Sequence, residues 1–124
     1  MNQTSIIFEK NALREQIDVE DVGFICELYE EFIKQLKEAE WESVQVKTRD
    51  DVLAFAHKHA HRLKSSALAV GAQQLGLCLK NLEAAAYNNS PELQAIFSIF
   101  QLLTSSTQIA IAEELAVLKG TNFQ

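Results

Sequence analysis

The sequence has few of the residues that break helices or cross-link loops. Its 124 residues include four glycines, one proline and two cysteines. So few turn-forming residues argue against a β protein, which needs a turn after every short strand. Two cysteines do not make a disulfide framework. Cys26 and Cys78 fall within stripes of apolar residues, and we expect both to pack as small apolar side chains.

The chain also lacks an uninterrupted apolar run of about 18 residues, so we expect no transmembrane span. Its N-terminus is polar, with no basic flank before an apolar stretch, and we therefore expect no signal peptide. The composition, 48% hydrophobic and 23% charged, is typical of a globular chain. We expect residues 1–124 to form a single cytoplasmic domain.

Acidic residues predominate overall but are missing from one stretch. Eleven basic and seventeen acidic residues give a net charge of −6, which argues against binding to nucleic acid or to an anionic membrane. Positions 52–82 contain no Asp or Glu and carry a charge of +4, which leaves −10 for the rest of the chain. This basic stretch contains four cations and all three histidines: Lys58, Arg62, Lys64, Lys80, His57, His59 and His61.

Apolar residues recur every three or four positions and predict helices along almost the whole chain. A short amphipathic segment covers residues 8–17. A long helix starts after Asp18, its predicted N-cap, and fades within residues 41–47. Thr48 is the predicted N-cap of the next helix, and Gly71 interrupts the pattern.

The helical pattern resumes at Leu75 and ends in the turn-like segment 87–89. Ser90 is the predicted N-cap of a last helix and Pro91 its first residue, and this helix closes near Gly120. Four long amphipathic helices with short connections predict an all-α fold. The expected architecture is an antiparallel four-helix bundle with a short additional N-terminal helix.

The third predicted helix carries a second stripe besides its apolar core stripe. Five residues at spacings of four, four, three and four share one helix face: Leu53, His57, His61, Lys64 and Leu68. We expect this face to lie toward solvent. An exposed apolar pair around His and Lys is typical of a docking patch with reactive groups in its middle. His59 lies on a different face, and we expect no role for it.

A turn at Gly71 would bring Glu83 close to His61. His61 lies ten residues before this glycine and Glu83 twelve residues after it, about 15 and 18 Å along two antiparallel helices. A carboxylate beside an imidazole accepts the Nδ1 proton and fixes the tautomer whose Nε2 lone pair is free. A nucleophilic histidine needs this arrangement. The alternative is that Glu83 is only a solvated helix residue.

Two other functions are open from the residues alone. His57 and His61 have a spacing that suits a metal site in a helical bundle. However, no Glu-x-x-His motif occurs and few carboxylates lie nearby to complete a ligand set, so we expect no metal. The same His57/His61 face could instead serve a purely structural adaptor, which would bind a partner without chemistry.

One run of residues resembles the signature of histidine-containing phosphotransfer domains, the intermediates of bacterial multistep two-component phosphorelays. The run is His61-Arg62-Leu63-Lys64-Ser65-Ser66-Ala67, followed by Gly71, Leu82 and Glu83. The close match spans residues 59–86, and the flanking predicted helices fit the family in number and length. The resemblance therefore covers essentially the whole chain.

The resemblance implies roles for several side chains. His61 would accept the phosphoryl group through an exposed Nε2, Lys64 would offset the phosphate charge, and Glu83 would hold the imidazole. Ser65 stands where the family usually has a glycine, and that glycine lets a partner approach closely. Ser65 instead adds a hydroxyl near the phosphoryl group. The implied docking residues around this centre are His57, Lys58, Arg62, Ser65 and Leu68.

The resemblance also implies partners. The chain would take a phosphoryl group from the receiver domain of a hybrid sensor kinase and pass it to receiver domains of response regulators. The receiver would bring Mg²⁺ and an acidic pocket that the basic stretch complements, so the chain would need no cofactor of its own. No ATP site is visible, so we expect no kinase activity. We further expect a monomer that binds neither nucleic acid nor membranes.

Overall fold

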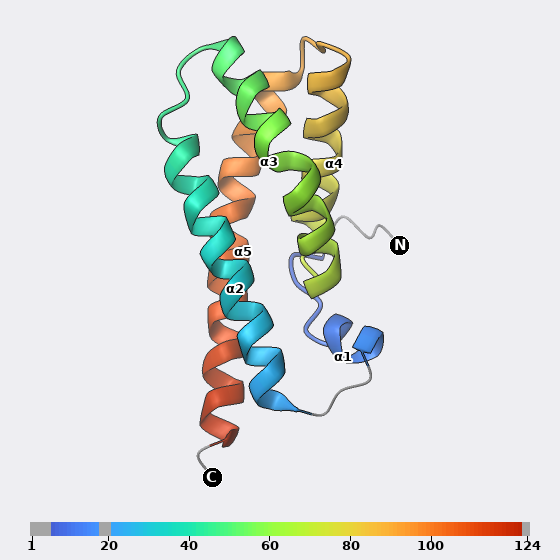
Figure 1. The fold of residues 1–124 in the computed structure, drawn as a ribbon, viewed down its shortest axis with the longest axis vertical. Coiled ribbons are helices and arrows are strands. Elements are labelled where there is room, and N and C mark those ends of the chain that lie inside the picture. The colour runs from blue at the N-terminus through green and yellow to red at the C-terminus, as the bar shows by residue number, and fades with distance from the viewer. Residues whose placement is uncertain (1–5, 18–20, 123–124) are drawn as a thin grey trace.

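The computed structural model describes residues 6–17 and 21–122 of the chain. Within these ranges it contains no strand and five helices: α1 (Ala12–Ile17), α2 (Val22–Ser43), α3 (Arg49–Val70), α4 (Gln73–Tyr87) and α5 (Leu93–Asn122). Helices α2 to α5 run antiparallel in sequence order (Figure 1), and α2 and α4 each pack against both α3 and α5. The predicted all-α bundle with a short N-terminal helix is confirmed.

The α3–α4 hairpin is shorter than the pair formed by α2 and α5, which extends beyond it, and α1 lies below the hairpin turn (Figure 1). The N-terminal segment is tied to this turn by backbone hydrogen bonds. The amide of Glu9 donates to the carbonyl of Gly71 at 2.7 Å, and the amide of Gln74 donates to the carbonyl of Ile6 at 3.0 Å. These bonds close the lower end of the hairpin.

Local sequence signals set both ends of α3. The side chain of Thr48 accepts a hydrogen bond from the amide of Asp51, whose carboxylate accepts from the amide of Thr48 in return. This capping box starts the helix. Gly71 ends it in the left-handed conformation with φ of 94°, and a side chain there would also collide with the carbonyl of Glu9. The predicted cap and the predicted break are confirmed.

The first helices begin later than predicted. Within the predicted segment 8–17, the helix begins only at Ala12. Asp18, the predicted cap of the next helix, lies outside the described residues. The cap of α2 is instead Asp21, whose carboxylate accepts a hydrogen bond from the amide of Phe24. Both residues can act as caps, and the one directly before the apolar periodic run does so.

The last helix differs from the prediction at both ends. Ser90 and Pro91 belong to a turn before α5, in which the hydroxyl of Ser90 accepts a hydrogen bond from the amide of Glu92. At the other end α5 continues through Gly120 to Asn122. A glycine stops a helix when the backbone becomes left-handed at that point, and Gly71 is the one described glycine with a positive φ.

Both cysteines are buried and unpaired, as predicted. Burial raises the pKa of the Cys78 thiol to about 11 and also raises the pKa of Cys26. A thiol must ionise to act as a nucleophile, and the raised pKa values keep both thiols neutral. The two buried cysteines therefore serve as packing residues of the core. Most other members of the core come from the four long helices, the largest fully buried apolar side chains being Ile25, Tyr29, Leu36, Leu63, Leu75, Leu79, Leu82, Leu93, Phe100 and Ile111.

Helix α5 is more apolar than the sequence prediction anticipated. Its segment Leu93–Gly120 is long and apolar enough to cross a membrane, judged by length and composition alone. In the bundle, however, α5 supplies buried core side chains, among them Phe97, Phe100 and Ile111. Only 28% of its most apolar window is buried in the bundle, and a single helix of this kind is weak evidence for a membrane span.

Candidate functional site

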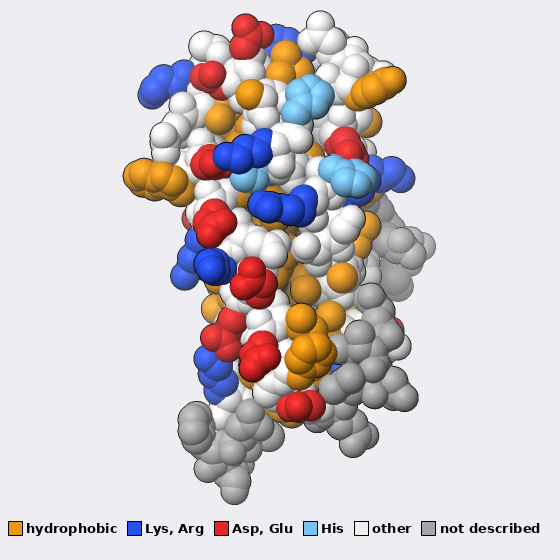
Figure 2. All heavy atoms as spheres, viewed as in Figure 1, with side chains coloured by type: hydrophobic (Ala, Val, Ile, Leu, Met, Phe, Trp, Pro, Cys, Tyr) orange, Lys and Arg blue, Asp and Glu red, His pale blue; other side chains and the backbone are white. Residues whose placement is uncertain are grey.

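The predicted His/Lys stripe of α3 lies on the surface beside α4. His57 and His61 are exposed, Leu68 is half exposed, Leu53 is partly buried, and Lys64 has 23% of its side chain accessible. Histidine and basic side chains gather over the upper part of this face, while acidic side chains follow α2 beside it (Figure 2). The expected orientation is therefore confirmed for His57, His61 and Leu68. Leu53 packs partly against the core, so the predicted exposed apolar pair is not formed.

The hairpin brings Glu83 of α4 level with His61, as predicted. His61 Nδ1 lies 2.7 Å from Glu83 Oε2. A carboxylate only accepts hydrogen bonds, so Nδ1 carries the hydrogen and donates it. In the neutral imidazole Nε2 then has a free lone pair, and 76% of the His61 side chain is exposed. His61 thus presents a nucleophilic nitrogen to solvent, and Glu83 is more than a solvated helix residue.

The second oxygen of Glu83 binds Lys64. Lys64 Nζ donates to Glu83 Oε1 at 2.9 Å, so one carboxylate of α4 holds a histidine and a lysine from adjacent turns of α3. The hydrogen bond from Lys64, and next that from His61, lower the pKa of Glu83 from its ordinary value of 4.5. Glu83 is therefore an anion at neutral pH. The contact with Lys64 was not predicted from the sequence.

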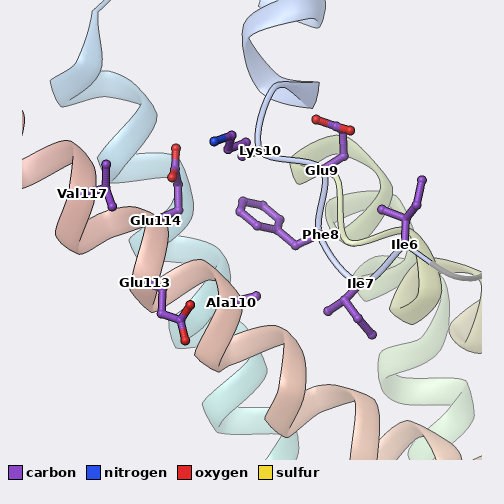
Figure 3. A pocket seen from close by; sticks show the side chains of 9 residues that line it. All are labelled: Ile6, Ile7, Phe8, Glu9, Lys10, Ala110, Glu113, Glu114 and Val117. Carbon is purple, nitrogen blue, oxygen red and sulfur yellow. The ribbon is translucent and has the colours of Figure 1, made fainter.

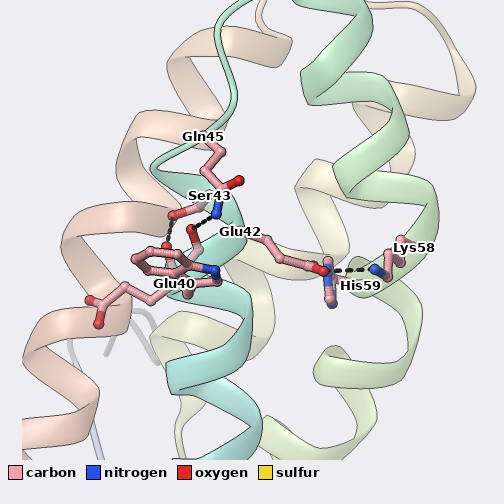
Figure 4. Close-up of polar contacts among 7 residues, drawn as sticks. Glu40, Glu42, Ser43, Gln45, Lys58 and His59 are labelled. Atoms are coloured by element: carbon pink, nitrogen blue, oxygen red, sulfur yellow. Dashed lines mark hydrogen bonds and ion pairs between the residues drawn. The ribbon is translucent and has the colours of Figure 1, made fainter.

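A second carboxylate binds a histidine and a lysine on the other side of α3. Glu42 of α2 accepts a hydrogen bond from Lys58 Nζ at 2.7 Å and also contacts His59 Nε2 (Figure 4). His59 is buried, and its ring lies 4.7 Å from that of Phe55, measured between centroids. Hydrogen bonds from Lys58 and His59 lower the pKa of Glu42. This cluster ties α2 to α3.

The two bound histidines differ in the nitrogen that remains open. His61 is held at Nδ1, and its Nε2 makes no hydrogen bond within the described part of the chain. His59 is held at Nε2, and its Nδ1 is buried without a hydrogen-bond partner. Only 5% of the His59 side chain is exposed, so no reactant reaches it unless the bundle opens. Histidine chemistry on this surface is thus confined to His61 and to the exposed His57.

The structure separates the basic residues that were predicted to surround His61. Lys58 is engaged by Glu42 on the α2 side, so it is not brought together with His61. Arg62 is exposed and forms no ion pair within the described part of the chain. The sequence did not predict that Glu42 binds Lys58 and His59. A loop joins α2 to α3, and a loop sets the register of two helices less tightly than a short turn does.

The remaining predicted residues lie along the same face of α3. Ser65 is exposed one turn beyond His61. Leu68 lies over Gly76 of α4, where an added Cβ would be 2.5 Å from Leu68 Cδ2. Gly76 therefore lets the leucine side chain lie close against α4. Sequence reasoning missed this contact, although a glycine within a helical pattern is a recognised signal of close approach.

Within residues 6–17 and 21–122, no three His, Cys, Asp or Glu side chains are grouped so that they could hold a metal ion. His57 and His61 therefore have no third metal ligand among the described residues.

Hollows elsewhere on the surface include one beside the N-terminal segment and one between α4 and α5. The larger, of about 610 Å³, lies between the N-terminal segment and α5, where Phe8 faces the helix near Glu113 and Glu114 (Figure 3). A groove of about 240 Å³ between α4 and α5 is lined mainly by apolar side chains, including Ile96 and Leu103. Neither hollow contains a histidine, so neither offers a nucleophile comparable with His61.

The best-defined site is therefore the exposed face of α3 and α4 around His61. It combines a nucleophilic nitrogen, an anion that orients the ring and a lysine bound to the same anion. Comparisons of the chain with protein-family models, curated proteins and solved structures find no match, so a functional assignment rests on this geometry and on the sequence.

Proposed function

We propose that this chain is a phosphorelay intermediate of the histidine-containing phosphotransfer type. His61 accepts a phosphoryl group from the aspartyl phosphate of one receiver domain and passes it to the aspartate of another. One observation carries the proposal. Glu83 binds His61 at Nδ1 on an exposed face, which leaves Nε2 open to attack phosphorus.

The transfer requires little from the protein beyond the imidazole and its carboxylate. The lone pair of His61 Nε2 forms a bond to phosphorus while the bond from phosphorus to the aspartate oxygen breaks, and the aspartate leaves as a carboxylate. The hydrogen on Nδ1 stays in place, so the ring becomes cationic while it carries the phosphoryl group. Glu83, whose Oε2 lies 2.7 Å from Nδ1, stabilises that positive charge. Transfer to the next aspartate reverses these steps.

Lys64 provides the second electrostatic contribution. It lies one turn from His61 on α3, within the range at which an ammonium offsets the charge of phosphoryl oxygens. Before phosphorylation, Glu83 holds this ammonium at 2.9 Å. Phosphorylation puts an anion on Nε2 and a cation beside Glu83, so the attraction of Lys64 shifts from the carboxylate toward the phosphoryl group.

The partner supplies what this chain does not. A receiver domain contributes Mg²⁺ and its acidic pocket, while this chain contributes the nucleophile and a basic docking surface. The proposal therefore includes no cofactor bound by this chain and no kinase activity of its own. The proposed partners are the receiver domain of a hybrid sensor kinase and those of response regulators. We propose that this chain is itself a monomer and acts in the cytoplasm.

Incubation with radiolabelled phospho-receivers tests the proposal. The wild-type chain should take up phosphate that is labile in acid and stable in base, as phosphohistidine is. His61→Gln should abolish the labelling. His57→Gln is the matched control, because it removes an exposed histidine one turn away, and it should retain most of the labelling. Labelling that survives in His61→Gln, or no labelling of the wild type by a panel of receivers, would contradict the proposal.

A further inference from the structure

Two contacts show which residues of α3 and α4 lie level with each other. His61 is bound to Glu83 in the middle of the hairpin, and Leu68 lies over Gly76 nearer the turn. In an antiparallel pair, one turn back along α3 corresponds to one turn forward along α4. Tyr87 follows Glu83 by one turn, so it stands level with the residue one turn before His61, which is His57.

Tyr87 lies on the side of α4 that carries Glu83. The two residues are four positions apart, so they share a helix face and are about 6 Å apart along the axis. Tyr87 is 85% exposed, the largest exposed fraction among the large hydrophobic side chains of the described residues. Its side chain makes no hydrogen bond or ring contact within that part of the chain.

The charges on this face favour an acidic partner. Lys80 precedes Glu83 by three positions and lies on the same side of α4. Lys80 and Arg62 are exposed, and neither forms an ion pair with any described residue. Glu83 is the one acidic residue of α4, and it is already held by two partners. The α3–α4 face is therefore left with unpaired positive charge, which complements carboxylates on another protein.

We infer that α4 forms part of the docking surface: Tyr87 is an apolar anchor for the partner, and Lys80 pairs with the partner's carboxylates. This inference rests on the proposed function, in which the partner is an acidic receiver domain. A standard interface covers about 800 Å² on each side, which is a patch of roughly 16 Å radius. A receiver placed over His61 Nε2 therefore also covers Tyr87. Tyrosine is enriched among interface residues with large binding contributions, because its ring supplies contact area at a low cost in side-chain entropy.

The test separates docking from chemistry by using two phosphoryl donors. A phospho-receiver must dock, whereas phosphoramidate is a small donor that needs no docking surface. Tyr87→Ala should lower receiver-dependent labelling of His61 roughly tenfold or more at limiting receiver concentration, and its labelling by phosphoramidate should equal that of the wild type. Tyr87→Phe should retain most of the receiver-dependent rate. Lys80→Ala should lower that rate and weaken its dependence on salt.

Trp41→Ala is the matched control, because Trp41 is an exposed aromatic residue on α2 and its loss should leave both reactions unchanged. If Tyr87→Ala behaves like Trp41→Ala, or slows both donors equally, the inference is overturned while the proposed function stands. If the wild type accepts phosphate from neither donor, the proposed function fails and the inference fails with it. Thermal unfolding of each variant verifies that the bundle is intact.

Discussion

His61 and His59 are two residues apart on α3, and carboxylates bind them through opposite ring nitrogens, Nδ1 in His61 and Nε2 in His59. Positions two apart in a helix point about 200° away from each other. One ring therefore lies at the surface against α4, while the other is buried against α2. A single helix thus keeps one histidine available for chemistry and uses its neighbour to hold the bundle together.

Replacing Glu83 should change the tautomer of His61. Glu83→Ala removes the acceptor at Nδ1, so the ring should populate both neutral tautomers and phosphoryl transfer should slow roughly 10- to 100-fold without being lost. Glu83→Gln keeps an acceptor and should retain much of the rate. Nitrogen-15 shifts of the two ring nitrogens report the tautomer, with His57 as an internal reference. Unchanged shifts of His61 in Glu83→Ala would show that the two side chains do not meet in solution.

Replacing Lys64 should affect transfer far more than folding. Its ion pair with Glu83 is partly exposed, and such pairs contribute about 1 kcal/mol or less to stability. Lys64→Ala should therefore change the free energy of unfolding by no more than that amount, while transfer to His61 slows clearly. Lys64→Arg, which keeps the charge, should recover part of the rate. A large loss of stability combined with normal transfer would place Lys64 among the structural residues instead.

Replacing Leu68 should weaken receiver binding with little effect on folding. Leu68 is 48% exposed, so Leu68→Ala should cost well below the 2–5 kcal/mol that is typical of a core leucine. Gly76→Ala should also impair binding, because the new methyl group displaces the Leu68 side chain. Receiver affinity and melting temperature measured on both variants test this. A destabilisation of core size in Leu68→Ala would mean that the leucine is buried in solution.

Stability should depend on the ionisation of Glu42 and Glu83. Hydrogen bonds from Lys58 and His59 lower the pKa of Glu42, as those from Lys64 and His61 lower the pKa of Glu83, both from an ordinary value of 4.5. The unfolded chain therefore takes up protons first as the pH falls. The stabilisation is complete above about pH 4.5 and is lost as the pH falls through the lowered pKa values.

Urea unfolding at a series of pH values measures this effect. Glu42→Gln and Glu83→Gln should each flatten the fall in unfolding free energy below about pH 4.5. Glu31→Gln is the control, since Glu31 is exposed and forms no ion pair among the described residues. An equal acid slope in all three variants and in the wild type would show that the two carboxylates do not contribute.

The all-α fold and the contact between His61 and Glu83 followed from the sequence. Both depend on regular quantities, namely the periodicity of apolar residues and the constant rise of a helix on each side of Gly71. A hairpin with a short turn leaves little freedom in register, so residues at nearly equal distances from the turn, such as His61 and Glu83, lie level with each other. Caps were less predictable, because several nearby polar residues compete for each helix start, as Asp18 and Asp21 do at α2.

By itself, the sequence determined how many helices form and roughly where they lie, and which face of α3 carries His57 and His61. Only the tertiary structure decided the side-chain partners other than the His61–Glu83 pair. It assigned Lys64 to Glu83, Lys58 and His59 to Glu42, and Leu68 to the space over Gly76. The physical reason is that helical periodicity is local, whereas the rotation and register of helices joined by loops depend on how all four long helices pack around a common core.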